Sequence, residues 1–164
     1  HVVAGISTNM AERDTTILNY ARPAQGSIEE QEHAQLIKLY AAVVNAILTH
    51  KYVPAMALPT KKNKLDWTIG DNARALRGKS DVEYALFIYM RDAYSSPSRV
   101  VTMAIGAFFG ILVPGGAQAG LASLVDLKTG KIIWFNRMMS ATGDLRGPDP
   151  ARAAVDHLLE GFPL

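Results

Sequence analysis

The feature that most constrains this chain is a pair of short apolar segments separated by a tight polar turn. Residues 121–125 and 132–135 are rich in branched and aromatic side chains, and the turn between them begins at Asp126 and ends at Gly130. Branched and aromatic side chains suit a pleated, half-buried surface, whereas aspartate and glycine readily form turns. The pattern therefore predicts a β-hairpin in which Asp126 is a turn former.

Length and composition predict a single soluble domain over residues 1–164. Of the 164 residues, 49% are hydrophobic and 20% are charged, which is typical of a globular protein that buries a core. A net charge of +2 is too small to favour a nucleic-acid partner. The dense basic cluster of Lys61, Lys62 and Lys64 is interpreted as a solvated loop, so we expect no nucleic acid to bind.

The chain contains no cysteine and begins at His1 without a basic and apolar leader. The lack of cysteine excludes a disulfide framework, a thiolate zinc site and a cysteine nucleophile within this sequence. We interpret the start at His1 as that of a processed or trimmed chain, and we expect an export signal to precede it.

Residues 100–125 carry no charge, and this length would suffice for a membrane helix. Pro114 and the glycines that follow it interrupt the stretch, however, and leave only 100–113 as a continuous apolar run. That run is shorter than the roughly 20 residues that a membrane span requires. We therefore expect two strands, at 99–109 and 118–126, joined by a glycine-rich turn.

The strongest helical pattern covers residues 28–49. Ser27 and Glu30 form a capping box, in which each side chain can accept a hydrogen bond from a free backbone N–H of the other residue. Apolar residues then recur at helical spacing. They are Leu36, Tyr40, Val43 and Ile47, with Ile37, Val44 and Leu48 beside them.

Two shorter helices are predicted farther along the chain. The first covers 68–77 and ends at Gly78. The second begins with Asp149 as its N-cap and Pro150 at its first position, and it stops at Gly161. Its apolar stripe consists of Ala151, Val155, Leu158 and Phe162.

The remaining apolar segments predict strands. Residues 84–89 are apolar on both faces, as in a central strand that is covered on both sides. Residues 2–7, 15–20 and 52–58 also have strand character, and 131–138 completes the hairpin. We predict an α+β fold with a mixed sheet of about five strands, a C-terminal hairpin and three flanking helices.

Known chemical motifs are incomplete in this sequence. The segment Gly78-Lys79-Ser80 lacks the earlier glycine of a phosphate-binding loop, because that position is Ala73, and the glycines at 115–120 lack dinucleotide spacing. His33, in EEQEH, has no second histidine on its helical face and is interpreted as part of the solvated first turns of a helix. We therefore assign no catalytic, cofactor-binding or metal-ligating residue, and no cofactor.

The hairpin sequence LASLVDLKTGKIIWFN resembles the LVD-x-x-TG-x-x-xW pattern of small bacterial envelope lipoproteins. Four stretches support the resemblance, namely DWTIG at 66–70, YALFIYMRDAYSS at 84–96, GGAQAG at 115–120 and GDLR at 143–146. Together they resemble an uncharacterised bacterial lipoprotein family that is related in fold to the amino-terminal domains of CsgG, LpoB and TolB. The resemblance is good over about residues 66–164 and weak before them.

The resemblance implies a three-layer α/β arrangement and a periplasmic location, with an N-terminal lipid outside this sequence anchoring the protein to the outer membrane. It also implies a non-catalytic accessory protein of the cell envelope that acts through contacts with another envelope protein. The resemblance leaves open whether the protein also forms a homo-oligomer. The rival hypothesis is a hydrolase or a small-ligand-binding protein. Its site would form from residues distant in sequence, around 115–120 and Arg91 with Asp92.

Overall fold

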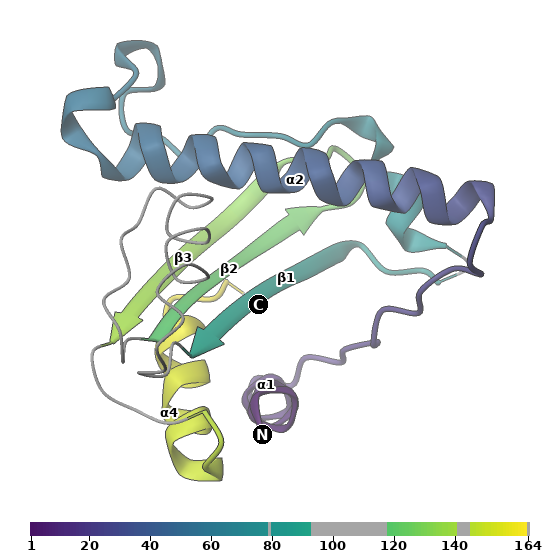
Figure 1. Cartoon of the computed structure of the whole chain (residues 1–164), viewed down its shortest axis with the longest axis vertical. Coiled ribbons are helices and arrows are strands. Elements are labelled where there is room, and N and C mark those ends of the chain that lie inside the picture. The colour runs from purple at the N-terminus through teal and green to yellow at the C-terminus, as the bar shows by residue number, and fades with distance from the viewer. Residues whose placement is uncertain (79, 93–117, 141–144, 164) are drawn as a thin grey trace, which may run out of the picture.

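The computed structural model describes residues 1–78, 80–92, 118–140 and 145–163 (Figure 1). These residues form an α+β fold with the element order α1, α2, η1, η2, η3, β1, β2, β3, α4. The predicted strand at 99–109 and the glycines at 115 and 116 lie outside the described residues.

The sheet consists of β1 (Tyr84–Asp92), β2 (Gln118–Asp126) and β3 (Ile132–Ser140) in the spatial order β1-β2-β3. Both neighbouring pairs are antiparallel. The predictions of about five strands and of a mixed sheet are therefore wrong for the described chain. Among the described strands, the central one is β2. The segment 84–89, which was predicted to be central, belongs to β1. In the described chain, β1 pairs only with β2.

The predicted hairpin is confirmed by the antiparallel pairing of β2 with β3, which has one irregularity between Leu124 and Val125. The carboxylate of Asp126 accepts hydrogen bonds from the backbone N–H of Lys128 at 2.7 Å and the hydroxyl of Thr129 at 2.8 Å. These bonds, the one from Thr129 above all, lower the pKa of Asp126. Asp126 is thus the turn former that the sequence indicates.

Helix α1 (Val2–Glu12) replaces the strand predicted at 2–7. Val2, Ile6 and Met10 are spaced four residues apart, so they lie on one face of a helix, and all three join a buried cluster with α4. The strand prediction was wrong because two β-branched residues at the start hid this longer period.

Two other predicted strands are not present. Residues 15–20 pair with no described strand, and a strand requires a hydrogen-bonded neighbour. Within 52–58, Tyr52 ends α2 and the short 3₁₀-helix η1 (Pro54–Met56) follows, before η2 (Pro59–Lys61). Each 3₁₀-helix begins at a proline, which lacks the N–H that a central strand needs and suits a first helical position.

Helix α2 (Ile28–Tyr52) confirms the strongest helical prediction and extends it by three residues. The Ser27 hydroxyl accepts from the backbone N–H of Glu30 at 3.0 Å, as the capping box predicts. The Glu30 carboxylate accepts from the backbone N–H of Gly26 at 2.6 Å, one residue earlier than the motif implies.

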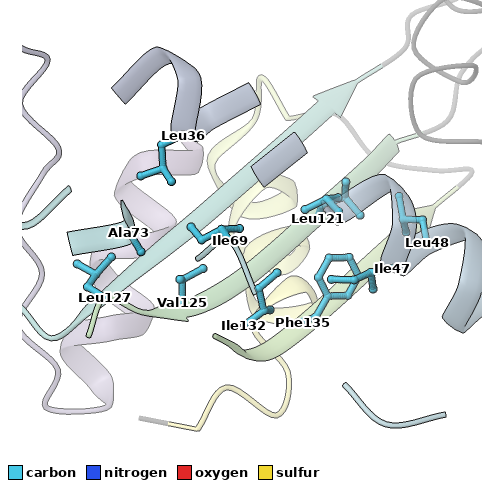
Figure 2. Close-up of a cluster of buried hydrophobic side chains, with 11 residues drawn as sticks. Leu36, Ile47, Leu48, Ile69, Ala73, Leu121, Val125, Leu127, Ile132 and Phe135 are labelled. Carbon is cyan, nitrogen blue, oxygen red and sulfur yellow. The ribbon is translucent and has the colours of Figure 1, made fainter. Parts of the chain in front are cut away.

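The apolar face of α2 packs on one face of the sheet (Figure 2). Along β2, alternate residues point to opposite faces, so every second side chain meets α2. The buried residues of this cluster include Leu36, Val44, Ile47 and Leu48 from α2, and Leu121, Val125, Ile132 and Phe135 from the sheet. The shorter η3 (Asp71–Arg77) adds Ala73 and ends at Gly78 with φ 53°, in place of the helix predicted at 68–77.

Helix α4 (Pro148–Leu158) and α1 pack on the opposite side of β2. The N-cap of α4 is Gly147, so the helix starts before the predicted cap at Asp149. Gly161 lies beyond the end of α4 and has φ 70°. The predicted stripe of Ala151, Val155, Leu158 and Phe162 is buried throughout. Three residues of this stripe, Val155, Leu158 and Phe162, belong to a second apolar core. The same core contains Met10, Ala122, Leu124 and Met138.

Trp134 on β3 is half-buried and meets Phe162 edge-on, with ring centroids 5.3 Å apart and planes at 89°. We expect Trp134→Ala to lower the free energy of unfolding by about 2 kcal/mol, less than the 3–5 kcal/mol typical of a fully buried aromatic ring. Urea denaturation would measure the loss, and a double-mutant cycle with Phe162→Ala should give a coupling of about 0.5–1.5 kcal/mol. A wild-type midpoint for Trp134→Ala would contradict this prediction.

Candidate functional site

The connection between α1 and α2 carries large apolar side chains that lie open to solvent. Ile17, Leu18 and Tyr20 are 37%, 64% and 54% exposed, and Ile28, the first residue of α2, is 77% exposed. We call these four residues the connection surface. Exposed apolar groups that gather into one surface patch mark interaction sites, so we take these four residues as the candidate.

The start of the connection is fixed by the end of α1. Asp14 adopts a left-handed conformation with φ 54°, and the backbone N–H of Thr15 donates to the Met10 carbonyl at 3.0 Å. The N–H of Asp14 donates to the Ala11 carbonyl at 3.1 Å. These two bonds form a Schellman motif, which satisfies the last carbonyls of α1 and turns the chain outward.

Arg13 ties this end of the connection to the end of α4. Its guanidinium donates to the side chain of Asn9 at 2.9 Å and to the carbonyls of Leu159 at 3.2 Å and Phe162 at 3.3 Å. Asn9 in turn donates to Asp156 at 2.7 Å. Arg13 thus ties the end of α1 to backbone carbonyls just beyond the end of α4.

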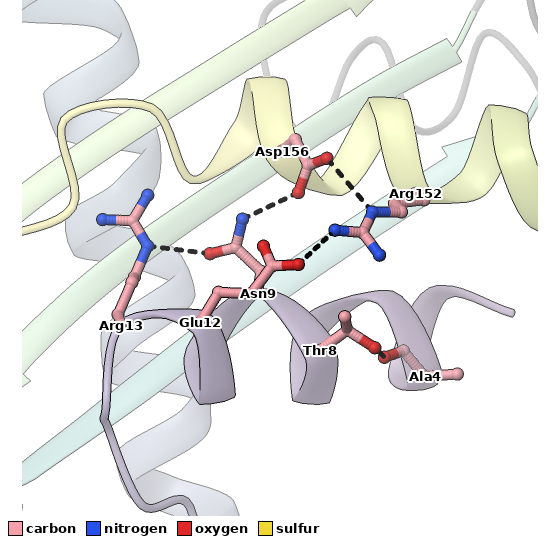
Figure 3. A network of polar contacts seen from close by, with 7 residues as sticks. All are labelled: Ala4, Thr8, Asn9, Glu12, Arg13, Arg152 and Asp156. Carbon is pink, nitrogen blue, oxygen red and sulfur yellow. Dashed lines mark hydrogen bonds and ion pairs between the residues drawn. The ribbon is translucent and has the colours of Figure 1, made fainter.

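A second contact joins the same two helices (Figure 3). Arg152 on α4 pairs with Glu12 near the end of α1, and its Nε atom lies 3.7 Å from Asp156 of its own helix. The residues joined by the interhelical contacts are 140 or more positions apart in sequence. The exposed connection therefore starts from a firmly held point.

The middle of the connection is held at Tyr20 by His33, which is only 5% exposed. Its Nε2 atom lies 3.0 Å from the Ala75 carbonyl, and its Nδ1 atom lies 2.7 Å from the Tyr20 hydroxyl. Because a carbonyl only accepts, Nε2 carries a hydrogen, and in the neutral ring Nδ1 accepts from Tyr20. The interpretation of His33 as a solvated residue was wrong, since it links the connection, α2 and η3.

Another buried polar pair lies between α2 and the sheet. The Tyr40 hydroxyl is 2.7 Å from that of Ser123, which is fully buried, and the Tyr40 ring stacks on Phe87 at 4.1 Å. Burial raises the pKa of Tyr40 to about 12, against the smaller opposing effect of the Ser123 hydrogen bond. Tyr40 therefore stays protonated at neutral pH and satisfies the buried hydroxyl.

Two stretches that carry the family resemblance meet in space. The backbone N–H of Ile69, in DWTIG, donates to the Gly130 carbonyl at 2.9 Å, and the N–H of Ile132 donates to the Trp67 carbonyl at 2.9 Å. A bridge between Thr68 and Lys131 lies between these bonds. DWTIG therefore pairs with the end of the hairpin turn, which gives both stretches a structural role.

The described residues of the rival hypothesis lie at one end of the sheet. Arg91 pairs with Ala119, and Asp92 pairs with Gln118. Gln118 is 2% exposed, and its Nε2 atom has no hydrogen-bond partner in the described part of the chain. Gly115 and Gly116 lie outside that part, so the rival site stays a prediction.

The other histidines lie near helix ends, as the sequence indicates. His50 lies 2.7 Å from the Met56 carbonyl through Nδ1, and the exposed His157 is in the last turn of α4. In the described ranges, no three His, Asp or Glu side chains are placed to hold a metal ion. Within the same ranges, no helix is both long and apolar enough to cross a membrane.

Comparisons with protein-family models, with curated proteins and with solved structures find no match to this chain.

Proposed function

We propose that this chain is a non-catalytic accessory protein of the bacterial cell envelope that acts by binding another envelope protein. The observation that carries the proposal is the connection surface, in a segment that is anchored at its start by Arg13 and at Tyr20 by His33. A segment that is already held at two points loses less conformational entropy when a partner covers it. Its exposed apolar side chains would supply the buried centre of an interface.

Three polar side chains that a catalytic site could use have structural roles instead, which fits a non-catalytic protein. His33, Tyr40 and Asp126 each form hydrogen bonds that join elements or shape a turn. The family resemblance supplies the setting, namely a three-layer arrangement in the periplasm with an outer-membrane lipid on a segment before His1. Two of the stretches that carry the resemblance, DWTIG and the hairpin, form one structural unit.

Site-specific photo-crosslinking in the native host would test the proposal. A photoreactive residue would replace Leu18 or Ile28 in the full-length protein, and Lys128, an exposed residue on the hairpin turn, would be the control position. We expect discrete adducts from the first two positions in the envelope fraction and none from the third. An adduct of twice the subunit mass would identify a second copy as the partner.

Equal crosslinking at all three positions would show that the connection surface is not an interface. Fractionation of the full-length protein with the cytosol would contradict the envelope setting. The rival hypothesis would gain if a small ligand stabilised the purified chain and the substitutions Arg91→Ala and Asp92→Ala removed that effect.

A further inference from the structure

The segment from the last turn of α2 to the start of η3 carries a net positive charge. Residues 50–66, which we call the basic loop, contain four lysines and one aspartate, a formal charge of +3, against +2 for the whole chain. The rest of the chain is therefore slightly negative. The sequence interpretation recognised three of these lysines as a solvated loop, and the structure adds Lys51, at the end of α2, to them.

The tip of the basic loop is apolar and exposed. Val53 and Met56 are 40% and 56% exposed, and the residues between them are exposed as well. The loop extends past the end of α2, at the upper left of Figure 1. Its two 3₁₀ turns each begin with a proline, which restricts the backbone and holds the tip in place.

Two of the lysines brace the loop and two point to solvent. Lys51 donates to the Asn63 carbonyl at 2.8 Å, and Lys61 donates to a backbone carbonyl within the loop. Lys62 and Lys64 are exposed, and neither ammonium group bonds to any other described residue. Their charges are thus available to an anionic partner.

We propose that the basic loop binds the surface of a membrane that contains anionic phospholipids. The lysines would contact the headgroups, while Val53 and Met56 enter the boundary between headgroups and acyl chains. The combination of an apolar tip with flanking lysines matches the layered chemistry of such a surface. This contact is separate from the connection surface and does not depend on a covalent lipid.

A nucleic acid would be a poorer match for the same charges. Binding of single strands relies on aromatic faces on which bases stack. Here Lys61 covers the ring of Trp67 with its ammonium 4.7 Å from the centroid, and Arg137 covers that of Tyr52 at 4.1 Å. A phosphate backbone would also leave the apolar side chain of Met56 without a partner.

Vesicle sedimentation with the 164-residue chain would test the proposal. The probes are vesicles of phosphatidylcholine alone and vesicles that also contain phosphatidylglycerol, each at low and high salt. We expect binding only to the anionic vesicles, with release at high salt. The variant Lys62→Gln/Lys64→Gln should bind about thirtyfold more weakly, since each charge near such a surface contributes about 1 kcal/mol.

Matched variants separate the loop from net charge. Arg22→Gln/Lys38→Gln removes two exposed charges elsewhere and should bind like the wild type. Met56→Ser should weaken binding, whereas Met139→Ser, at a methionine that is 46% exposed on β3, should not. Full binding by Met56→Ser would overturn insertion of the tip.

Equal losses in the two charge variants would overturn the loop as the binding site. Equal binding to neutral and anionic vesicles would overturn the electrostatic contact. If the chain ignored vesicles but bound an oligonucleotide through Lys62 and Lys64, the partner would be a nucleic acid and the membrane proposal would fail.

Discussion

Substituting Gly130 by alanine should lower the free energy of unfolding by about 2–5 kcal/mol. Gly130 has φ 68°, and a Cβ atom there would overlap the carbonyl oxygen of Gly70 and lie 2.7 Å from its carbonyl carbon. The left-handed conformation costs an L-residue about 1–2 kcal/mol. Moving the backbone of Gly70 out of the way adds about 1–3 kcal/mol. The total loss is a large share of the free energy of unfolding of an ordinary domain, which is about 5–15 kcal/mol.

Gly26→Ala is the matched control for this prediction. Gly26 has φ 79°, but a Cβ atom there would meet nothing within 4 Å, so only the conformational cost of about 1–2 kcal/mol applies. Urea denaturation of both variants would isolate the cost of the close contact. Equal losses would show that the pairing of DWTIG with the turn does not restrict residue 130.

The substitution Ile47→Ala should lower the free energy of unfolding by about 2–5 kcal/mol. Ile47 is fully buried in the cluster between α2 and the sheet, where its removal leaves a cavity that close packing cannot refill. Denaturation by urea or heat would measure the effect.

Ile37→Ala, on the same helix, tests whether burial is the cause. Ile37 is 47% exposed, and alanine has the higher helix propensity, so we expect a change within about 0.5 kcal/mol. A large loss from Ile37→Ala would mean that α2 presents a different face to the sheet.

The elements that could be predicted from sequence are those whose signals are local. The bounds of β2 at 118–126 are those that the pattern predicted, because its apolar residues lie directly before the turn that begins at Asp126. The caps of α2 at Ser27 and of η3 at Gly78 are likewise set by neighbouring residues. Such signals need no knowledge of the tertiary fold.

The candidate site could not be predicted, because it depends on contacts between distant segments. His33 belongs to a polar segment and is buried only because η3 and Tyr20 cover it. Residues 15–20 have the composition of a strand, yet they have no neighbouring strand in the described chain, and their apolar side chains remain exposed. The apolar residues of α1 have helical spacing, but α4, the helix that they pack against, lies at the opposite end of the sequence.

Helix α1 can pack against α4 only after the whole chain between them has been synthesised. Helix α1 is synthesised well before α4 and the residues after it, which accept the hydrogen bonds of Asn9 and Arg13. Contacts between such distant positions form late, because a long stretch of chain must first be closed into a loop. Until α4 has been made and has packed on the sheet, Met10 lacks most of its partners in the second core, and an apolar face stays open to chaperones or to premature association.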